Sequence, residues 1–201
     1  IRVLIVDDSP FMRRILSDIL KLDKDIIVVG QANNGKEALE KIPTLNPDVI
    51  TMDIEMPIMD GITALEYIVK DHNIPVVMIS SLTEEGATLT LKALDIGAID
   101  FIPKPKNIFS ISDRFTKMEI INKVKEASRS KINLKYEGKK ISTSSINYLK
   151  PSKWNNEKFE YIIAIGTSTG GPRALQSVIP LLPEDINGSI VVVQHMPPKF
   201  T

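Results

Sequence analysis

Several apolar runs in the sequence are followed, at once or after one residue, by residues that could do chemistry. These residues are Asp7 and Asp8 after run 2–6, Asp53 after 48–52, Ser80 and Ser81 after 75–79, and Lys104 after 99–102. If the runs are parallel strands, their carboxyl ends meet at one edge of a sheet, so three carboxylates and an ammonium should gather there. Crowded carboxylates repel each other and need a cation, and Mg²⁺ prefers such oxygen ligands. The pattern predicts a phosphoryl-transfer site with Asp53 as the nucleophile and Lys104 as a charge partner.

A structural role for these acidic residues is the competing interpretation, because carboxylates at strand ends also cap helices. Asp8 could cap the first helix, and Asp60 beside Gly61 is expected to be a turn residue. Capping explains neither Asp53 nor Lys104. The joint occurrence of these residues therefore favours a site over a set of unrelated caps.

A second constellation lies near the end of the sequence. An apolar run at 161–165 leads into a glycine-rich segment that contains G-x-S-x-G around Ser168, followed by a predicted helix at 171–182. A strand–turn–helix of this kind exposes a serine beside backbone N–H groups, although the same geometry can cradle a phosphate. His195 directly follows the next predicted strand, 190–194, and favours a serine nucleophile with a histidine base. His72 receives no role.

The elements that position these residues alternate along the chain. Short Val- and Ile-rich runs at 2–6, 26–30, 48–52, 75–79 and 99–102 are separated by amphipathic helical segments that begin at Ser9-Pro10 and at residues 35, 62 and 85. Five alternations predict an α/β fold with a doubly wound parallel sheet. The later segments, with a further strand at 189–194, predict the N-terminal part of a second doubly wound α/β domain.

Composition and charge agree with a domain followed by part of another. The 201 residues are 43% hydrophobic, and residues 1–104 carry a net charge of −7 whereas 105–201 carry +7. Part of the basic stretch is expected to be helical, because Ile111, Phe115, Met118, Ile121 and Val124 fall roughly on one face. The absence of cysteine and of any membrane-length apolar run predicts a cytoplasmic protein without membrane insertion.

The segments V-D-D-S-P, D-I-E-M-P-I-M-D-G, S-S and F-I-P-K-P resemble the signature segments of bacterial response-regulator receiver domains, over about residues 1–125. The resemblance implies a flavodoxin-like (βα)5 fold and phosphorylation of Asp53 by a histidine kinase. It further implies that Asp7, Asp8, Asp53 and the backbone carbonyl of Glu55 hold Mg²⁺. Ser80 and Lys104 would engage the phosphoryl group, and Phe101 would be the aromatic that reports the switch. Without the resemblance, Phe101 is interpreted as a core residue.

The segments G-T-S-T-G-G and Q-H-M-P-P-K-F-T resemble the catalytic domain of the CheB family of chemotaxis methylesterases, over about residues 159–201, with 126–158 as a linker. The resemblance implies cofactor-free hydrolysis of glutamate methyl esters, and deamidation of glutamines, on methyl-accepting chemoreceptors. Ser168 would be the nucleophile and His195 the base. Thr169 and Gly170 would lie at the oxyanion side.

One departure from the family pattern concerns the triad acid. In the family an aspartate far downstream of the histidine completes the triad, whereas these 201 residues end six positions after His195. The segment is therefore expected to be inactive, although its parent is an enzyme. Two alternatives have other outputs: a DNA-binding regulator, which the strand–helix–strand ending disfavours, and a receiver that acts only by binding a partner. No nucleic acid is expected as a partner.

Overall fold

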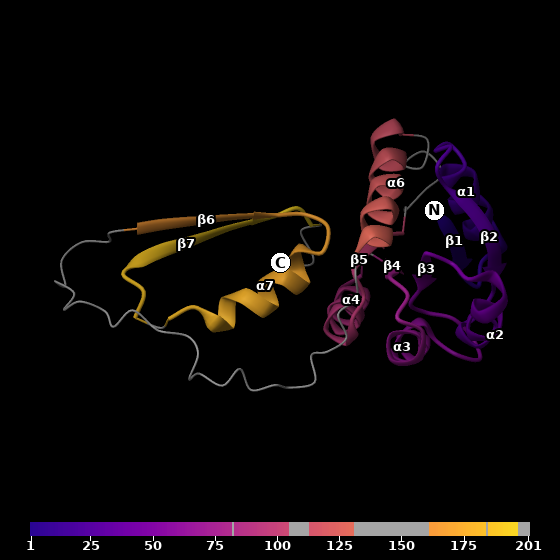
Figure 1. The fold of residues 1–201 in the computed structure, drawn as a ribbon, viewed down its shortest axis with the longest axis horizontal. Coiled ribbons are helices and arrows are strands. Elements are labelled where there is room, and N and C mark those ends of the chain that lie inside the picture. Colours follow the sequence, from indigo (N-terminus) through magenta and orange to yellow (C-terminus); the bar gives the residue numbers. More distant parts are fainter. Residues whose placement is uncertain (82, 105–112, 131–160, 184, 197–201) are drawn as a thin grey trace.

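The computed structural model describes residues 1–81, 83–104, 113–130, 161–183 and 185–196, which form two units (Figure 1). The first unit is built on a parallel five-stranded sheet in the order β2-β1-β3-β4-β5. Its strands are β1 (Arg2–Val6), β2 (Ile27–Ala32), β3 (Val49–Asp53), β4 (Val76–Ser80) and β5 (Asp100–Pro103). The doubly wound parallel sheet predicted from the alternating runs is thereby confirmed.

Helices cover both faces of this sheet, which explains why its strands are continuously apolar. One face carries α1 (Pro10–Leu20) and α6 (Arg114–Arg129), and the other carries α2 (Gly35–Leu45), α3 (Gly61–Tyr67) and α4 (Glu84–Ile96) (Figure 1). Val3 and Ile5 pack on the first side and Leu4 and Val6 on the second, and all four are fully buried. The sheet thus lies between two hydrophobic cores, which fix the positions of the carboxyl ends of its strands.

Side-chain caps set where the helices begin. Ser9, rather than Asp8, caps α1 by accepting a hydrogen bond from the Met12 N–H, with proline at the first helical position. Asp60 caps α3 by accepting from the Thr63 N–H at 2.8 Å, so it is more than a turn residue. Asp8 is therefore left without a capping role.

The helix predicted in the basic stretch forms as α6, but the predicted apolar face is only partly correct. Ile121 and Val124 are buried, whereas Phe115 is 71% exposed and Met118 is 46% exposed. The first turns of α6 do not pack into the core of the sheet, so their large side chains remain accessible. The helix ends at Arg129, four residues beyond the expected domain end, and Ile111 and residues 131–158 of the expected linker lie outside the described residues.

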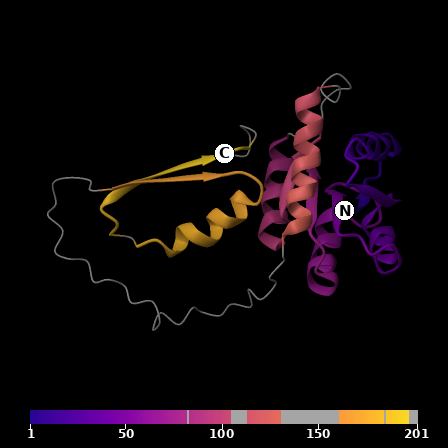
Figure 2. The same cartoon turned by 45° about the horizontal axis from the view of Figure 1, so that its top comes forward.

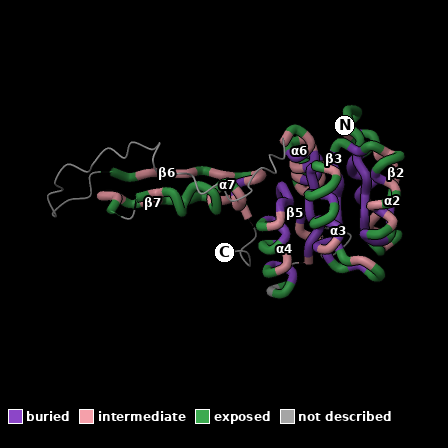
Figure 3. The backbone as a smooth tube through the Cα atoms, turned by 60° about the horizontal axis from the view of Figure 1, so that its bottom comes forward, coloured by how far each residue is buried: buried purple, intermediate pink, exposed green. Residues whose placement is uncertain are grey.

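The second unit is a strand–helix–strand motif. Strands β6 (Tyr161–Thr167) and β7 (Gly188–Gln194) pair in parallel, and α7 (Gly171–Val178), extended by a 3₁₀ turn at Ile179–Leu181, runs alongside them (Figure 2). Most of this unit is exposed or half-buried, in contrast to the buried sheet of the first unit (Figure 3). Within the described ranges, no helix is both long and apolar enough to cross a membrane.

Candidate functional site

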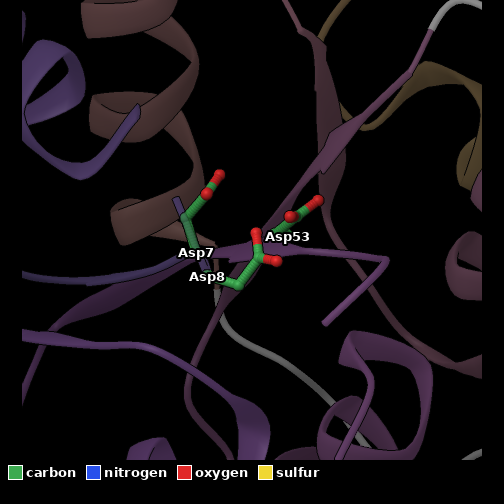
Figure 4. Close-up of side chains that lie close together, drawn as sticks. All are labelled: Asp7, Asp8 and Asp53. Atoms are coloured by element: carbon green, nitrogen blue, oxygen red, sulfur yellow. The ribbon is translucent and has the colours of Figure 1, made fainter. Parts of the chain in front are cut away.

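The acidic residues of the first unit meet at the carboxyl edge of the sheet. Asp7 and Asp8 follow β1, and Asp53 ends β3, the strand paired directly with β1. Each offers a carboxylate oxygen, and these three oxygens lie within 4.8 Å of one another (Figure 4). Asp7 and Asp53 are buried, whereas Asp8 is exposed. The topology thus places two buried carboxylates beside one that reaches solvent.

Burial dominates the electrostatics of this cluster. Burial raises the pKa of Asp53 to about 6. The hydrogen bond from Lys104 opposes this shift, whereas the negative charge of Asp7 adds to it. Burial likewise raises the pKa of Asp7, and the charge of Lys104 opposes that shift. Lys104 Nζ lies 2.6 Å from Asp53 Oδ2 and 3.9 Å from Asp7 Oδ2. One ammonium is therefore shared between two buried carboxylates and cannot neutralise both.

The donor set fits a hard divalent cation. Asp7 Oδ1 accepts a hydrogen bond from the Ser9 N–H at 2.9 Å, but the buried Oδ2 has no hydrogen-bond partner within the described part of the chain. An unsatisfied carboxylate oxygen is costly when buried, and a cation beside Asp8 and Asp53 would satisfy it. Glu55 lies in the turn that follows Asp53 and, with Asp8, lines a cavity of about 580 Å³ next to the cluster.

Ser80 and Phe101 lie beside the acidic cluster but are turned toward other partners. The Ser80 hydroxyl lies 2.6 Å from Thr90 Oγ1 and donates toward the carbonyl oxygens of Gly86, at 3.1 Å, and Ser81, at 3.2 Å. Phe101 is buried in the core on the α4 side, and Lys123 Nζ lies 5.3 Å from its ring centroid. Ser80 thus faces α4, and the ring of Phe101 is packed in the core.

The second constellation forms a tight turn between β6 and α7. Gly170 adopts a left-handed conformation, with φ of 71°, at the N-terminus of α7. The Gly171 N–H donates to the Ser168 carbonyl oxygen at 2.8 Å, and a Cβ on Gly171 would lie 2.0 Å from Gln194 Oε1. The backbone thus favours glycine at position 170, whereas at position 171 glycine makes room for the side chain of Gln194, and the turn places Ser168 near the N-terminus of α7.

Ser168, Thr169 and His195 line one cavity of about 200 Å³. Parallel pairing of β6 and β7 brings the serine and histidine to the same end of the sheet, where the His195 N–H donates to the Thr167 carbonyl oxygen at 3.3 Å. Among the described residues, the Ser168 hydroxyl and the His195 ring form no direct hydrogen bond. The remaining lining comes from one face of α6: Phe115, Met118, Glu119, Asn122, Lys123 and Glu126.

Contacts between α4 and α7 join the two units at a second place. Arg173 donates to the Gly97 carbonyl oxygen at 3.4 Å, and Gln176 donates to Asp95 Oδ1 at 2.5 Å. Met196, one residue beyond His195, packs against the core of the first unit. The first unit therefore also touches the second through residues that do not line the Ser168 cavity.

Gln194, which was not predicted from the sequence, joins the two halves of this site. Its Oε1 accepts a hydrogen bond from the Thr167 hydroxyl at 2.6 Å, and its Nε2 donates to the carbonyl oxygens of Ser168 and His195, each at 3.1 Å. The amide thereby ties the serine turn to the histidine loop. Its signal was present in the sequence, since it is a polar residue that ends an apolar strand directly before the histidine.

Family comparisons cover most of the chain. The model of the response regulator receiver domain matches residues 3–116, and that of the CheB methylesterase matches residues 163–201. Among solved structures, the response regulator domain of CheB from Thermotoga maritima is 50% identical, with a TM-score of 0.59, and the match covers 65% of this chain and 97% of that one.

Curated relatives match the chain from end to end. A protein-glutamate methylesterase/protein-glutamine glutaminase from Bacillus subtilis is 48% identical over 205 residues, a match that covers 100% of this chain and 57% of the relative. A protein of the same name from Pyrococcus abyssi is 46% identical, with 100% of this chain and 54% of the relative covered. The chain thus spans little more than half the length of these relatives.

Proposed function

Because the chain belongs to the response regulator receiver family and is homologous along its whole length to the CheB protein-glutamate methylesterases, we propose that it is a phosphorylation-controlled chemotaxis esterase. In this proposal residues 1–125 form the receiver, 126–158 a linker, and 159–201 a part of the catalytic domain. The observation that carries the proposal is the cavity that Ser168 and His195 share with α6 of the receiver unit.

In the first step Asp53 is phosphorylated. Its carboxylate attacks the phosphorus of a phosphohistidine on a histidine kinase, a new O–P bond forms, the P–N bond breaks, and the imidazole leaves. Lys104, 2.6 Å from Asp53 Oδ2, is placed to neutralise the phosphoryl oxygens. Mg²⁺ held by Asp7, Asp8, Asp53 and the Glu55 carbonyl would supply positive charge that screens the two approaching anions. Ser80 would turn from α4 to donate to the phosphoryl group, and Phe101 would follow.

Ester hydrolysis uses the second unit. The Ser168 hydroxyl attacks the carbonyl carbon of a glutamate methyl ester while His195 takes its proton, and methanol leaves with that proton. Water then hydrolyses the acyl-enzyme and regenerates the serine. With a glutamine substrate, ammonia leaves in place of methanol. Backbone N–H groups at Thr169 and Gly170 would face the oxyanion, and the Gln194 amide would hold the turn and the histidine loop together.

The receiver controls access to this chemistry. Six side chains of α6 line the cavity with Ser168 and His195, so the receiver bounds one side of the space in front of the nucleophile, although both residues remain exposed. The substrates are methyl-accepting chemoreceptors, whose methylated helices are too large to enter a cavity of about 200 Å³ unless α6 moves away. A cytoplasmic location is part of the same proposal. The DNA-binding alternative is disfavoured, because the segment after the linker is the strand–helix–strand of β6, α7 and β7.

The decisive test measures methylesterase rates on the full-length protein with and without a small phosphoryl donor. We expect the donor to raise the rate, and we expect both Asp53→Asn and removal of Mg²⁺ by a chelator to abolish the increase. Ser168→Ala should abolish hydrolysis under all conditions. A rate that does not respond to the donor would sink the regulatory proposal and leave the esterase proposal standing.

The segment 1–201 by itself should be a poor catalyst. Asp185 precedes β7 and so lies at the end of the sheet opposite His195, where it cannot orient the imidazole. Loss of the triad acid in serine hydrolases lowers the turnover rate by about 10⁴-fold. The 201-residue polypeptide should therefore accept phosphate on Asp53 and show no measurable hydrolysis.

A further inference from the structure

Ser80 is held in its α4-facing orientation by a buried threonine that belongs to none of the signature segments. Thr90, on α4, is fully buried, as is Ser80, and their hydroxyl oxygens lie 2.6 Å apart. The Thr90 hydroxyl also donates to the Gly86 carbonyl oxygen at 2.7 Å, one turn back along the same helix. Helix α4 lies between the sheet and α7, so this pair sits on the side of the receiver that meets the second unit (Figure 1).

The number of hydroxyl hydrogens explains how Ser80 and Thr90 can be satisfied both when Ser80 faces α4 and when it turns away. Each hydroxyl carries one hydrogen and can accept as well as donate. With Ser80 facing α4, one hydroxyl donates to the other and the second donates to the Gly86 carbonyl oxygen. When Ser80 turns away, Thr90 still has the Gly86 carbonyl as its acceptor. The turn therefore breaks the Ser80–Thr90 hydrogen bond without leaving the buried Thr90 hydroxyl unsatisfied.

We propose that Thr90 is a positioning residue that stabilises the unphosphorylated state by holding the Ser80 hydroxyl away from Asp53. The proposal rests on the proposed function of Ser80 as a phosphoryl ligand. Phosphorylation must then break the buried Ser80–Thr90 hydrogen bond, so Thr90 contributes to the free-energy difference between the unphosphorylated and phosphorylated states. Removing its hydroxyl shifts the equilibrium toward the state that binds the phosphoryl group.

The expected change in affinity follows from the net contribution of one neutral hydrogen bond to stability. Apparent affinity for a ligand of a minor state rises in proportion to the population of that state. Losing one such bond in the unphosphorylated state should raise that affinity by about two- to tenfold.

The experiment titrates the 201-residue chain with beryllofluoride, a phosphoryl mimic, in the presence of Mg²⁺, by isothermal titration calorimetry. Thr90→Val keeps the shape of the side chain and removes the hydroxyl, so it should bind beryllofluoride about two- to tenfold more tightly than the wild type. Thr90→Ser restores a hydroxyl and should return the affinity toward that of the wild type. Thermal unfolding of each variant establishes that it is folded.

Thr51→Val is the matched control, because Thr51 is also fully buried but its hydroxyl has no hydrogen-bond partner in the described part of the chain. It should leave the affinity unchanged. Equal or weaker binding by Thr90→Val would overturn the inference, as would Thr90→Ser binding as tightly as Thr90→Val. Failure of the wild type to bind, or binding that survives Asp53→Asn, would instead refute the phosphorylation function on which the inference rests.

Discussion

The turn from β3 to α3 leaves no room for a side chain at Gly61, and a single methyl group there should disable the phosphorylation site. A Cβ at this position would lie 1.9 Å from the Asp53 carbonyl oxygen and 2.9 Å from its carbonyl carbon. Both atoms belong to the backbone, so no rotamer change can relieve the contact. Reaching even 3.0 Å requires a backbone shift of at least 1.1 Å between Gly61 and the residue that carries the nucleophile.

The shift has two measurable costs. Forcing an extra methyl group into a packed site destabilises proteins by about 1–3 kcal/mol, which for a domain of this size lowers the melting temperature by about 4–12 °C. Misplacing a reacting group by about 1 Å can slow a reaction by about 100-fold. Gly61→Ala should therefore melt earlier and accept phosphate from acetyl phosphate about 100-fold more slowly than the wild type.

Gly30→Ala is the matched control in the same domain. There a Cβ would lie 2.5 Å from Leu45 Cδ1, the far end of a flexible side chain that can rotate away. It should cost less than about 1 kcal/mol and leave phosphorylation unchanged. Wild-type phosphorylation and melting in Gly61→Ala would refute the view that this backbone approach fixes the geometry of Asp53.

Three further predictions concern stability. Lys123→Met leaves Asp100 as an unpaired buried charge and should lower the free energy of unfolding, measured in urea, by about 3 kcal/mol. The hydrogen bond from Lys125 lowers the pKa of Asp23 below its ordinary 3.8. The pair therefore stabilises the folded state above pH 3.8, and this stabilisation is lost as the pH falls through the lowered pKa of Asp23. The difference in melting temperature between the wild type and Asp23→Ala should be present at pH 7 and shrink in acid. Ile58 is 82% exposed with φ of 69°, so Ile58→Asn should raise the free energy of unfolding by about 1 kcal/mol.

Exposed positions provide the controls for these predictions. The Arg14–Asp18 ion pair lies on the surface of α1, with 78% and 54% of the two side chains exposed. Arg14→Met should change the free energy of unfolding by less than about 0.5 kcal/mol. A loss equal to that in Lys123→Met would contradict the distinction between buried and exposed pairs. A pH-independent effect of Asp23→Ala, or a destabilising Ile58→Asn, would contradict the other two predictions.

Much of the fold followed from the sequence, because local and long-range signals agree in the first unit. Four of the five strands are short Val- and Ile-rich runs, and Pro10 marks a helix start, so element type and order could be predicted. The gathering of Asp7, Asp8, Asp53 and Lys104 also followed, since in a parallel sheet the residue after each strand lies at a known edge. That rule needs topology alone and no knowledge of side-chain conformations.

The missed features depend on tertiary contacts. The period of α6 grouped Phe115 with Val124, but only the later turns of that helix pack on the sheet, and nothing local in the sequence marks where the packing begins. Thr90 resembles any other helical threonine until α4 is placed against β4. The tie that Gln194 makes to Ser168 spans 26 residues and exists only once β6 and β7 are paired.

Strands β6 and β7 also have a consequence for self-association. Each is seven residues long, their sheet has only these two strands within the described residues, and Ile162 is 78% exposed and Val193 68% exposed. A short sheet with two open edges and an apolar surface is a template for strand pairing between copies. Copies of the 201-residue chain should therefore aggregate through this unit as concentration rises. The receiver, whose sheet between edge strands β2 and β5 is covered by helices on both faces, should stay monodisperse.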